Sequence, residues 1–162
     1  MPFDLSHDSP HHLFAGLVGG WAGTSRIWFT PDSAALEAPI QGSIQLILEG
    51  RFALFLYQSA VDGEPQHGIF TFGYNTLLNR WEASWIDSFH NNTAIMFCTG
   101  ASLEGGFAVT GSYPDPTGGP DWGWRTEVKV PGPDDLLITA YNILPDGLEA
   151  KAVEMLLARV KK

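Results

Sequence analysis

Hydrophobic and polar residues alternate with a period of two along most of the chain. In residues 20–29, Trp21, Ile27 and Phe29 fall on one face, and Arg26 falls on the other. Such alternation is typical of half-buried β-strands, in which successive side chains point to opposite faces of the sheet. Comparable segments are residues 20–29, 42–50, 51–59, 67–74, 80–88, 93–100, 107–113, 124–130, 135–143 and 149–160. The pattern predicts about ten short strands.

Only one helix is predicted, in residues 10–18. Ser9 can cap its first turn, Pro10 suits that turn, and Gly19–Gly20 would end it. Residues 1–9 read as a polar leader. The final segment, residues 149–160, has a helix-forming composition, but the preceding "PDG" turn favours a hairpin, so we predict a strand. No repeat or linker interrupts the pattern, so residues 1–162 form one predicted domain.

Closing the strands into an up-and-down barrel would remove both sheet edges. Trp21, flanked by Gly20 and Gly23, would then plug one end of the barrel. Arg159 on the last strand could lie over the indole ring as a cation–π partner. The other interpretation of Trp21 is an ordinary core tryptophan. The fold class predicted from these features is an all-β antiparallel barrel with a short N-terminal helix.

Several segments resemble known barrel families. A Gly-x-Trp near the first strand, with a late arginine, is similar to the calycin pattern of lipocalins and fatty-acid-binding proteins. More closely, Leu17 to Arg159 resembles a bacterial family called domain-of-unknown-function family 1579. The matching segments are "LVGGWAG", "GIFTFGYN", "WIDS", "DPTG" followed by Arg125, and "PDGLEAKAVEMLLAR". The family's Gly-Tyr-Asp is Gly73-Tyr74-Asn75 here. The resemblance implies an up-and-down barrel and no particular reaction.

Composition and charge narrow the possible partners. The formal net charge of -9 makes the chain a poor partner for nucleic acid or anionic membranes. The polar start "MPFDLSHDSPHH" lacks the apolar segment of a secretory signal, and no apolar run is long enough to cross a membrane. These features predict a cytoplasmic protein.

Metal, cofactor and nucleophile motifs are lacking in the sequence. His7, His11 and His12 are close together, but a mobile polar leader is the favoured interpretation. Haem-binding barrels of the nitrobindin family use a late histidine, whereas no histidine follows His90. Cys98, the single cysteine, lies in an apolar strand and reads as a buried, inert thiol. We therefore predict no metal site and no cofactor.

Polar residues within strands are the best candidates for function. Trp81, Ala83, Trp85 and Asp87 share one face, and its aromatic content predicts that it points into the barrel. An apolar interior with a few polar groups is the usual form of a small-ligand pocket. Asp87, the candidate catalytic residue, would need a buried partner, or its pKa would rise. The predicted ligand-binding residues are Phe70, Phe72, Tyr74, Trp85, Asp87, Arg125 and Tyr141.

Two placements of Arg125 remain open from the sequence. Arg125 can pair with Asp87 inside the barrel. Alternatively, Arg125, Glu127 and Lys129 can form an outer ladder against Lys151 and Glu154 on the last strand. The sequence does not decide between the inward and outward orientations.

Three functions follow from this pattern. The first is binding of a small, mostly apolar molecule in the barrel cavity. The second is a cofactor-free isomerase or cyclase, in which Asp87 or a tyrosine moves a proton. The third is a structural or interaction barrel filled by its own side chains. Segments such as "FALFL" and "AIMFC", apolar on both faces, further predict a homodimer.

Overall fold

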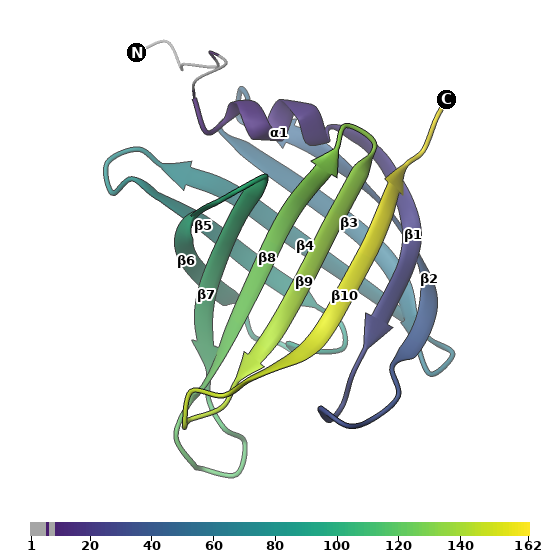
Figure 1. Ribbon diagram of the computed structural model, residues 1–162, viewed down its shortest axis with the longest axis vertical. Coiled ribbons are helices and arrows are strands. Elements are labelled where there is room, and N and C mark those ends of the chain that lie inside the picture. Colours follow the sequence, from purple (N-terminus) through teal and green to yellow (C-terminus); the bar gives the residue numbers. More distant parts are fainter. Residues whose placement is uncertain (1–5, 7–8) are drawn as a thin grey trace.

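The computed structural model, which describes residue 6 and residues 9–162, contains one short helix followed by ten strands (Figure 1). The predicted leader lies mostly outside the described residues, as does His7. The elements are α1 (His12–Leu17), β1 (Gly19–Ile27), β2 (Leu36–Ile47), β3 (Phe52–Val61), β4 (Glu64–Asn75), β5 (Arg80–Asp87), β6 (Met96–Leu103), β7 (Gly106–Tyr113), β8 (Trp122–Gly132), β9 (Asp135–Ile143) and β10 (Glu149–Arg159).

The ten strands form a closed antiparallel barrel. Each strand pairs with its neighbours in sequence, and β1 closes the barrel by pairing with β10. The closing register places Trp21 opposite Arg159 and Ile27 opposite Val153. Figure 1 shows β1 and β10 side by side, with α1 lying across one end of the barrel. The predicted fold class is confirmed, including the strand assignment of the last segment.

Local sequence explains where the elements begin and end. Asp62 and Gly63 both have positive φ, 50° and 82°, so the β3–β4 hairpin turns in two residues. As a result, Glu64–Gln66, expected in the turn, already belong to β4. Helix α1 is shorter than the predicted 10–18 range, and His11 rather than Ser9 is its N-cap residue. No helix in the described part of the chain is long and apolar enough to span a membrane.

Aromatic side chains fill the interior of the barrel. Phe55, Phe72 and Phe107 are fully buried, and the other hydrophobic residues of the core are at most 8% exposed. A ligand-sized chamber would leave its lining side chains accessible, and those of the core are not. The interior between α1 and the barrel centre is therefore packed with the protein's own side chains.

The end beneath α1 is closed by Trp21 and Arg159. The Trp21 indole is 1% exposed and donates a hydrogen bond to the carbonyl of Leu17, at 2.8 Å. The Arg159 guanidinium carbon lies 4.5 Å from the centre of the indole ring. Arg159 also donates to the carbonyls of Gly16 and Val18, at 2.6 and 2.7 Å. The arginine thus ties the last strand to α1 and to the first strand.

Candidate functional site

The polar centre of the interior is Asp87, the last residue of β5. Its Oδ2 atom accepts hydrogen bonds from Tyr57 Oη at 2.5 Å and Gln66 Nε2 at 2.9 Å. Its Oδ1 atom accepts from the backbone N–H groups of Phe89 and His90, both at 2.7 Å, and lies 3.2 Å from His90 Nδ1. Strands β3 and β4 and the β5–β6 turn therefore all donate to one carboxylate.

These hydrogen bonds control the ionisation of Asp87. Burial opposes the charge, but hydrogen bonds from His90 and Tyr57 outweigh it and lower the pKa of Asp87 to about 2. Burial and the Asp87 charge raise the pKa of Tyr57 well above its ordinary value. At neutral pH the pair is a carboxylate and a phenol. Asp87 therefore acts as a hydrogen-bond acceptor, and its partners are neutral donors and a histidine, so the inward pairing of Arg125 with Asp87 is not the one found.

Arg125 lies on the outer surface of the barrel, so it is not one of the cavity-lining residues among which it was predicted. Its side chain pairs with Glu127 on the same strand and with Glu149, at 2.7 Å. Lys129 extends this group by contacting Glu127 at 3.1 Å. The outer ladder was the correct alternative for Arg125, because residues on β8 alternate and Trp124 occupies the inward position.

The predicted ladder differs in one respect from the observed one. Glu154 and Lys151 do not join Arg125; they pair with each other at 2.9 Å, and Glu154 also contacts Arg26 at 3.0 Å. Glu154 therefore faces outward in a second ion-pair group, which links β10 to β1.

Tyr141 also lies outside, contrary to its predicted role in the cavity. The Arg125 guanidinium carbon is 4.4 Å from the centre of its ring. On β9 the inward positions are those of Leu136, Ile138 and Ala140, which are all buried. The face that Tyr141 shares with Leu137 and Ile143 points away from the core.

The other predicted aromatic residues lie inside but are not all together. The Trp85 ring stacks on Phe70 at 5.5 Å and on Trp124 at 5.2 Å. Phe72 packs against Phe107, with ring centres 5.5 Å apart, and Phe107 in turn stacks on Trp81 at 4.2 Å. Tyr74 lies at the α1 end, 5.2 Å from Trp81, and so far from Asp87 along the barrel axis.

Trp124 holds a polar group with no partner. Its side chain is 4% exposed, and its Nε1 atom has no hydrogen-bond acceptor among the described residues. The neighbouring inward polar groups are already engaged, because Tyr113 Oη donates to Asn142 Oδ1 at 2.5 Å. A buried donor without an acceptor costs about 1–3 kcal/mol unless water or a ligand satisfies it. This indole N–H therefore marks a place where an acceptor is missing.

Two loops meet across the end of the barrel that contains Trp124. Phe29, which follows β1, contacts Phe89 of the β5–β6 turn, with ring centres 6.0 Å apart. Both rings are partly in solvent, with exposed fractions of 59% and 43%. Directly behind Phe89 lies His90, whose ring contacts Trp85 at 5.3 Å and Trp124 at 5.9 Å. The exposed Phe29–Phe89 pair is thus connected to the unpaired indole through the ring of His90.

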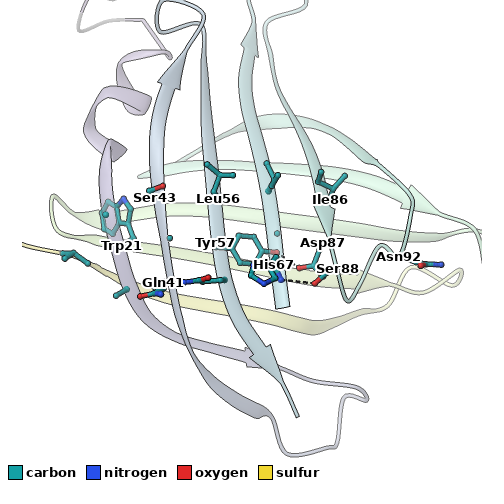
Figure 2. Close-up of a pocket in the computed structure, with 17 residues that line it drawn as sticks. Trp21, Gln41, Ser43, Leu56, Tyr57, His67, Ile86, Asp87, Ser88 and Asn92 are labelled. Atoms are coloured by element: carbon teal, nitrogen blue, oxygen red, sulfur yellow. Dashed lines mark hydrogen bonds between the residues drawn. The ribbon is translucent and has the colours of Figure 1, made fainter. Parts of the chain in front are cut away.

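A pocket lies elsewhere, as an open groove of about 730 Å³ across β1 to β5 (Figure 2). Ser43, Leu56, His67 and Ile86 line it, and these positions alternate with the inward ones, so most of the groove belongs to the outer face. Tyr57 and Asp87 contact it only from the inner side of the sheet. This pocket therefore lies mostly on the outer face, and not in the barrel interior where a cavity was expected.

Two other kinds of candidate site are a reactive cysteine and a metal-binding cluster. Burial raises the pKa of the Cys98 thiol to about 11, so the thiol stays protonated and unreactive. The described residues include no cluster of three or more histidine, cysteine, aspartate or glutamate side chains that could hold a metal ion.

Sequence reasoning did not identify Tyr57, Gln66, His90 or Trp124 as parts of the site. The alternation along β8 could have identified Trp124. Consecutive residues of a strand point to opposite faces, so Trp124 must lie inside if Arg125 lies outside. Nothing local in the sequence links Tyr57 to Asp87, because their contact depends on the register of β3, β4 and β5.

Comparisons with known proteins agree with the barrel. A family model described as "Protein of unknown function (DUF1579)" matches residues 6–159. The crystal structure of Rv2717c from M. tuberculosis is similar with a TM-score of 0.60 and 13% sequence identity, over 94% of this chain and 99% of that chain. At this identity the likeness establishes the fold alone. No curated protein matches the chain significantly.

Proposed function

Because the chain belongs to the DUF1579 family, whose description gives no activity, we propose its function from the site: it binds a small, mostly apolar molecule that carries a hydrogen-bond acceptor. The proposed site is the end of the barrel opposite α1. The unpaired, buried Nε1–H of Trp124 is the observation that carries this proposal.

The surroundings of Trp124 suit a flat apolar ligand. Stacked rings of Phe70, Trp85 and Trp124 form a continuous aromatic wall. The rings of this wall are 3–4% exposed, so a ligand reaches them only once the aromatic pair Phe29–Phe89 has moved aside. It would then bury apolar surface at about 25 cal/mol per Å², before the costs of association. An acceptor atom on the ligand would satisfy the indole N–H and so remove the cost of an unpaired donor.

Entry requires the Phe29–Phe89 contact to open. Both residues lie in segments between strands, and their rings are exposed, so separating them disturbs no part of the hydrogen-bonded barrel. The opposite end offers no comparable route, since the buried Trp21 indole, Arg159 and α1 close it.

The alternative of a structural or interaction barrel is favoured by the filled interior. The two functions differ in what they require of Trp124. A barrel without a ligand needs only the shape of the indole, whereas a binding site needs its N–H group.

Native mass spectrometry of freshly purified protein tests the proposal directly, because a tightly bound molecule remains attached to the barrel. Titration with 2-methoxynaphthalene, an apolar molecule with one acceptor oxygen, gives the affinity. The Trp124→Phe variant keeps an aromatic ring but has no N–H, so we expect the Kd to rise about tenfold.

Trp28→Phe is the matched control, because Trp28 faces Lys151 on the outside. It should bind the naphthalene derivative as the wild type does. If the folded wild-type protein binds neither a copurified molecule nor the added one, ligand binding is wrong and the barrel is a structural or interaction protein. If Trp124→Phe binds with unchanged affinity, the proposed location is wrong.

A further inference from the structure

His90 is held in one orientation by Asp87. The Asp87 carboxylate accepts from the backbone N–H of His90 at 2.7 Å and lies 3.2 Å from its Nδ1 atom. An ionised carboxylate can only accept hydrogen bonds, so this contact requires the proton to be on Nδ1. In the neutral imidazole, Nε2 then carries a free lone pair.

The free nitrogen of His90 is available to a ligand. Among the described residues, the His90 ring makes no hydrogen bond other than the one to Asp87. Its side chain is 14% exposed, whereas that of Asp87 is fully buried. The ring therefore reaches solvent at the end of the barrel while its orientation is fixed from the interior.

His90 and Trp124 together offer both kinds of hydrogen-bonding group. Their ring centres are 5.9 Å apart, and the Phe29–Phe89 pair covers the same end of the barrel. Trp124 supplies a donor without an acceptor, and His90 supplies an acceptor without a donor. One hydroxyl group can serve both, because its oxygen accepts one hydrogen bond and its proton donates another.

We propose that the ligand is a neutral, hydroxyl-bearing apolar molecule, such as a phenol or an alcohol, whose hydroxyl accepts from Trp124 Nε1 and donates to His90 Nε2. This inference rests on the proposed binding function and specifies its ligand class. Asp87 acts here as a positioning residue, which sets the tautomer of His90 and does not touch the ligand. A carboxylate ligand fits poorly, because it has no proton to give to His90 and would lie close to the charge of Asp87.

Three molecules of similar shape test the hydrogen bonds to Trp124 and to His90 separately. Naphthalene has neither group, 2-methoxynaphthalene has an acceptor only, and 2-naphthol has an acceptor and a donor. At about pH 8, the wild-type protein should bind 2-naphthol about tenfold more tightly than 2-methoxynaphthalene. The latter should in turn bind more tightly than naphthalene, through Trp124.

The His90→Phe variant should bind 2-naphthol and 2-methoxynaphthalene equally, while its preference for both over naphthalene persists. His67→Phe is the control, because His67 lies on the outer face in the groove of Figure 2, and it should keep the wild-type order. Equal binding of 2-naphthol and 2-methoxynaphthalene by the wild type overturns this inference and leaves the proposed function intact. Failure of all three molecules to bind overturns both.

A second measurement does not depend on any ligand. Nitrogen-15 NMR of the imidazole distinguishes the two neutral tautomers, and we expect the Nδ1–H form for His90. In the Asp87→Asn variant, His90 should lose its preference for the Nδ1–H tautomer, because the asparagine amide can donate a hydrogen bond as well as accept one. An Nε2–H tautomer in the wild-type protein would remove the proposed acceptor and refute the inference.

Discussion

The phenolic oxygen of Tyr57 lies 2.5 Å from Oδ2 of Asp87, although the two residues are 30 positions apart in the chain. The same oxygen accepts a hydrogen bond from Trp85 Nε1 at 2.9 Å. Tyr57 thus connects the carboxylate to the aromatic wall of the site. One hydroxyl group joins strands β3 and β5 through side chains, across the intervening strand β4.

Removing this hydroxyl should destabilise the protein. Tyr57→Phe leaves Trp85 Nε1 without its acceptor and takes one donor from a buried carboxylate, so we expect a loss of about 1–3 kcal/mol in the free energy of unfolding. Tyr141→Phe is the matched control on the outer face and should change stability by less than about 0.5 kcal/mol. Urea unfolding followed by tryptophan fluorescence measures both. Equal effects of the two variants would show that the buried hydroxyl contributes nothing special.

The position of the Tyr57 ring leaves no room for a side chain at Gly68. A Cβ atom added at Gly68 would lie 2.1 Å from both Cζ and Oη of the Tyr57 ring, so Gly68→Ala must displace that ring. We expect a loss of about 1–3 kcal/mol, as for other overpacked cores, together with loss of the Tyr57–Asp87 hydrogen bond.

Gly16→Ala provides the comparison, because a Cβ atom there meets nothing within 4 Å. Since alanine favours helix over glycine, this variant should be as stable as the wild type or slightly more so. Thermal unfolding of the two variants measures the difference. Unchanged stability of Gly68→Ala would mean that the Tyr57 ring has room to move.

Acid should weaken the fold through Asp87. Its folded-state pKa of about 2 is below the ordinary value of 3.8, so the folded state favours the charged form. The resulting contribution, about 2 kcal/mol, is complete above about pH 5 and is lost as the pH falls toward 2. Asp87→Asn should be less stable than the wild type at neutral pH, and its stability should depend less on pH in this range.

Denaturant unfolding at several pH values between about 2 and 6 follows this contribution. Asp62→Asn, in the exposed β3–β4 turn, is the control and should follow the wild-type curve. Parallel curves for the wild type and Asp87→Asn would show that ionisation of Asp87 does not contribute to the stability of the folded state.

The outer face of β3 to β6 should mediate a homodimer. Phe52, Leu56, Ile86 and Phe97 are exposed there, and none of the residues in this group is charged. Each copy carries a net charge of -9, so two copies repel each other least where this apolar group meets itself. The charged residues on the same face, Arg80 and Glu82, pair with each other at 2.8 Å. Phe97→Glu should therefore produce monomers.

Leu156→Glu is the control for the dimer, because Leu156 is similarly exposed on β10, beside the ion pairs of Glu154. It should leave the association unchanged. Analytical ultracentrifugation at micromolar concentration measures the mass. A single 17.7 kDa species for the wild-type protein would contradict the prediction.

Alternation was sufficient to predict the inner face where one side of a strand is clearly polar. On β5, Trp81, Trp85 and Asp87 point inward as expected. On β9 both faces are largely apolar, so the period alone could not tell the face of Tyr141 from the face of Ile138. The register then decided which face is buried, and register depends on all ten strands together.

The site itself was only partly predictable for a related reason. Asp87 stood out because an acid on an apolar face needs partners. Its partners come from two other strands and a turn, and His90 is part of that turn rather than of an alternating segment. Donors brought together by a turn have no periodicity in the sequence, so only the structure identifies them.

The pairing of β1 with β10 has a consequence for how the protein is made. Trp21 meets Arg159, which is synthesised about 138 residues after it. Until then β1 has one strand edge without its partner, and the barrel cannot close however early its other hairpins form. Contacts between residues this distant in sequence are slow to form, so barrel closure should be the late step of folding. A chain that ends before β10 would keep two open edges, and open edges are where chains of this kind aggregate.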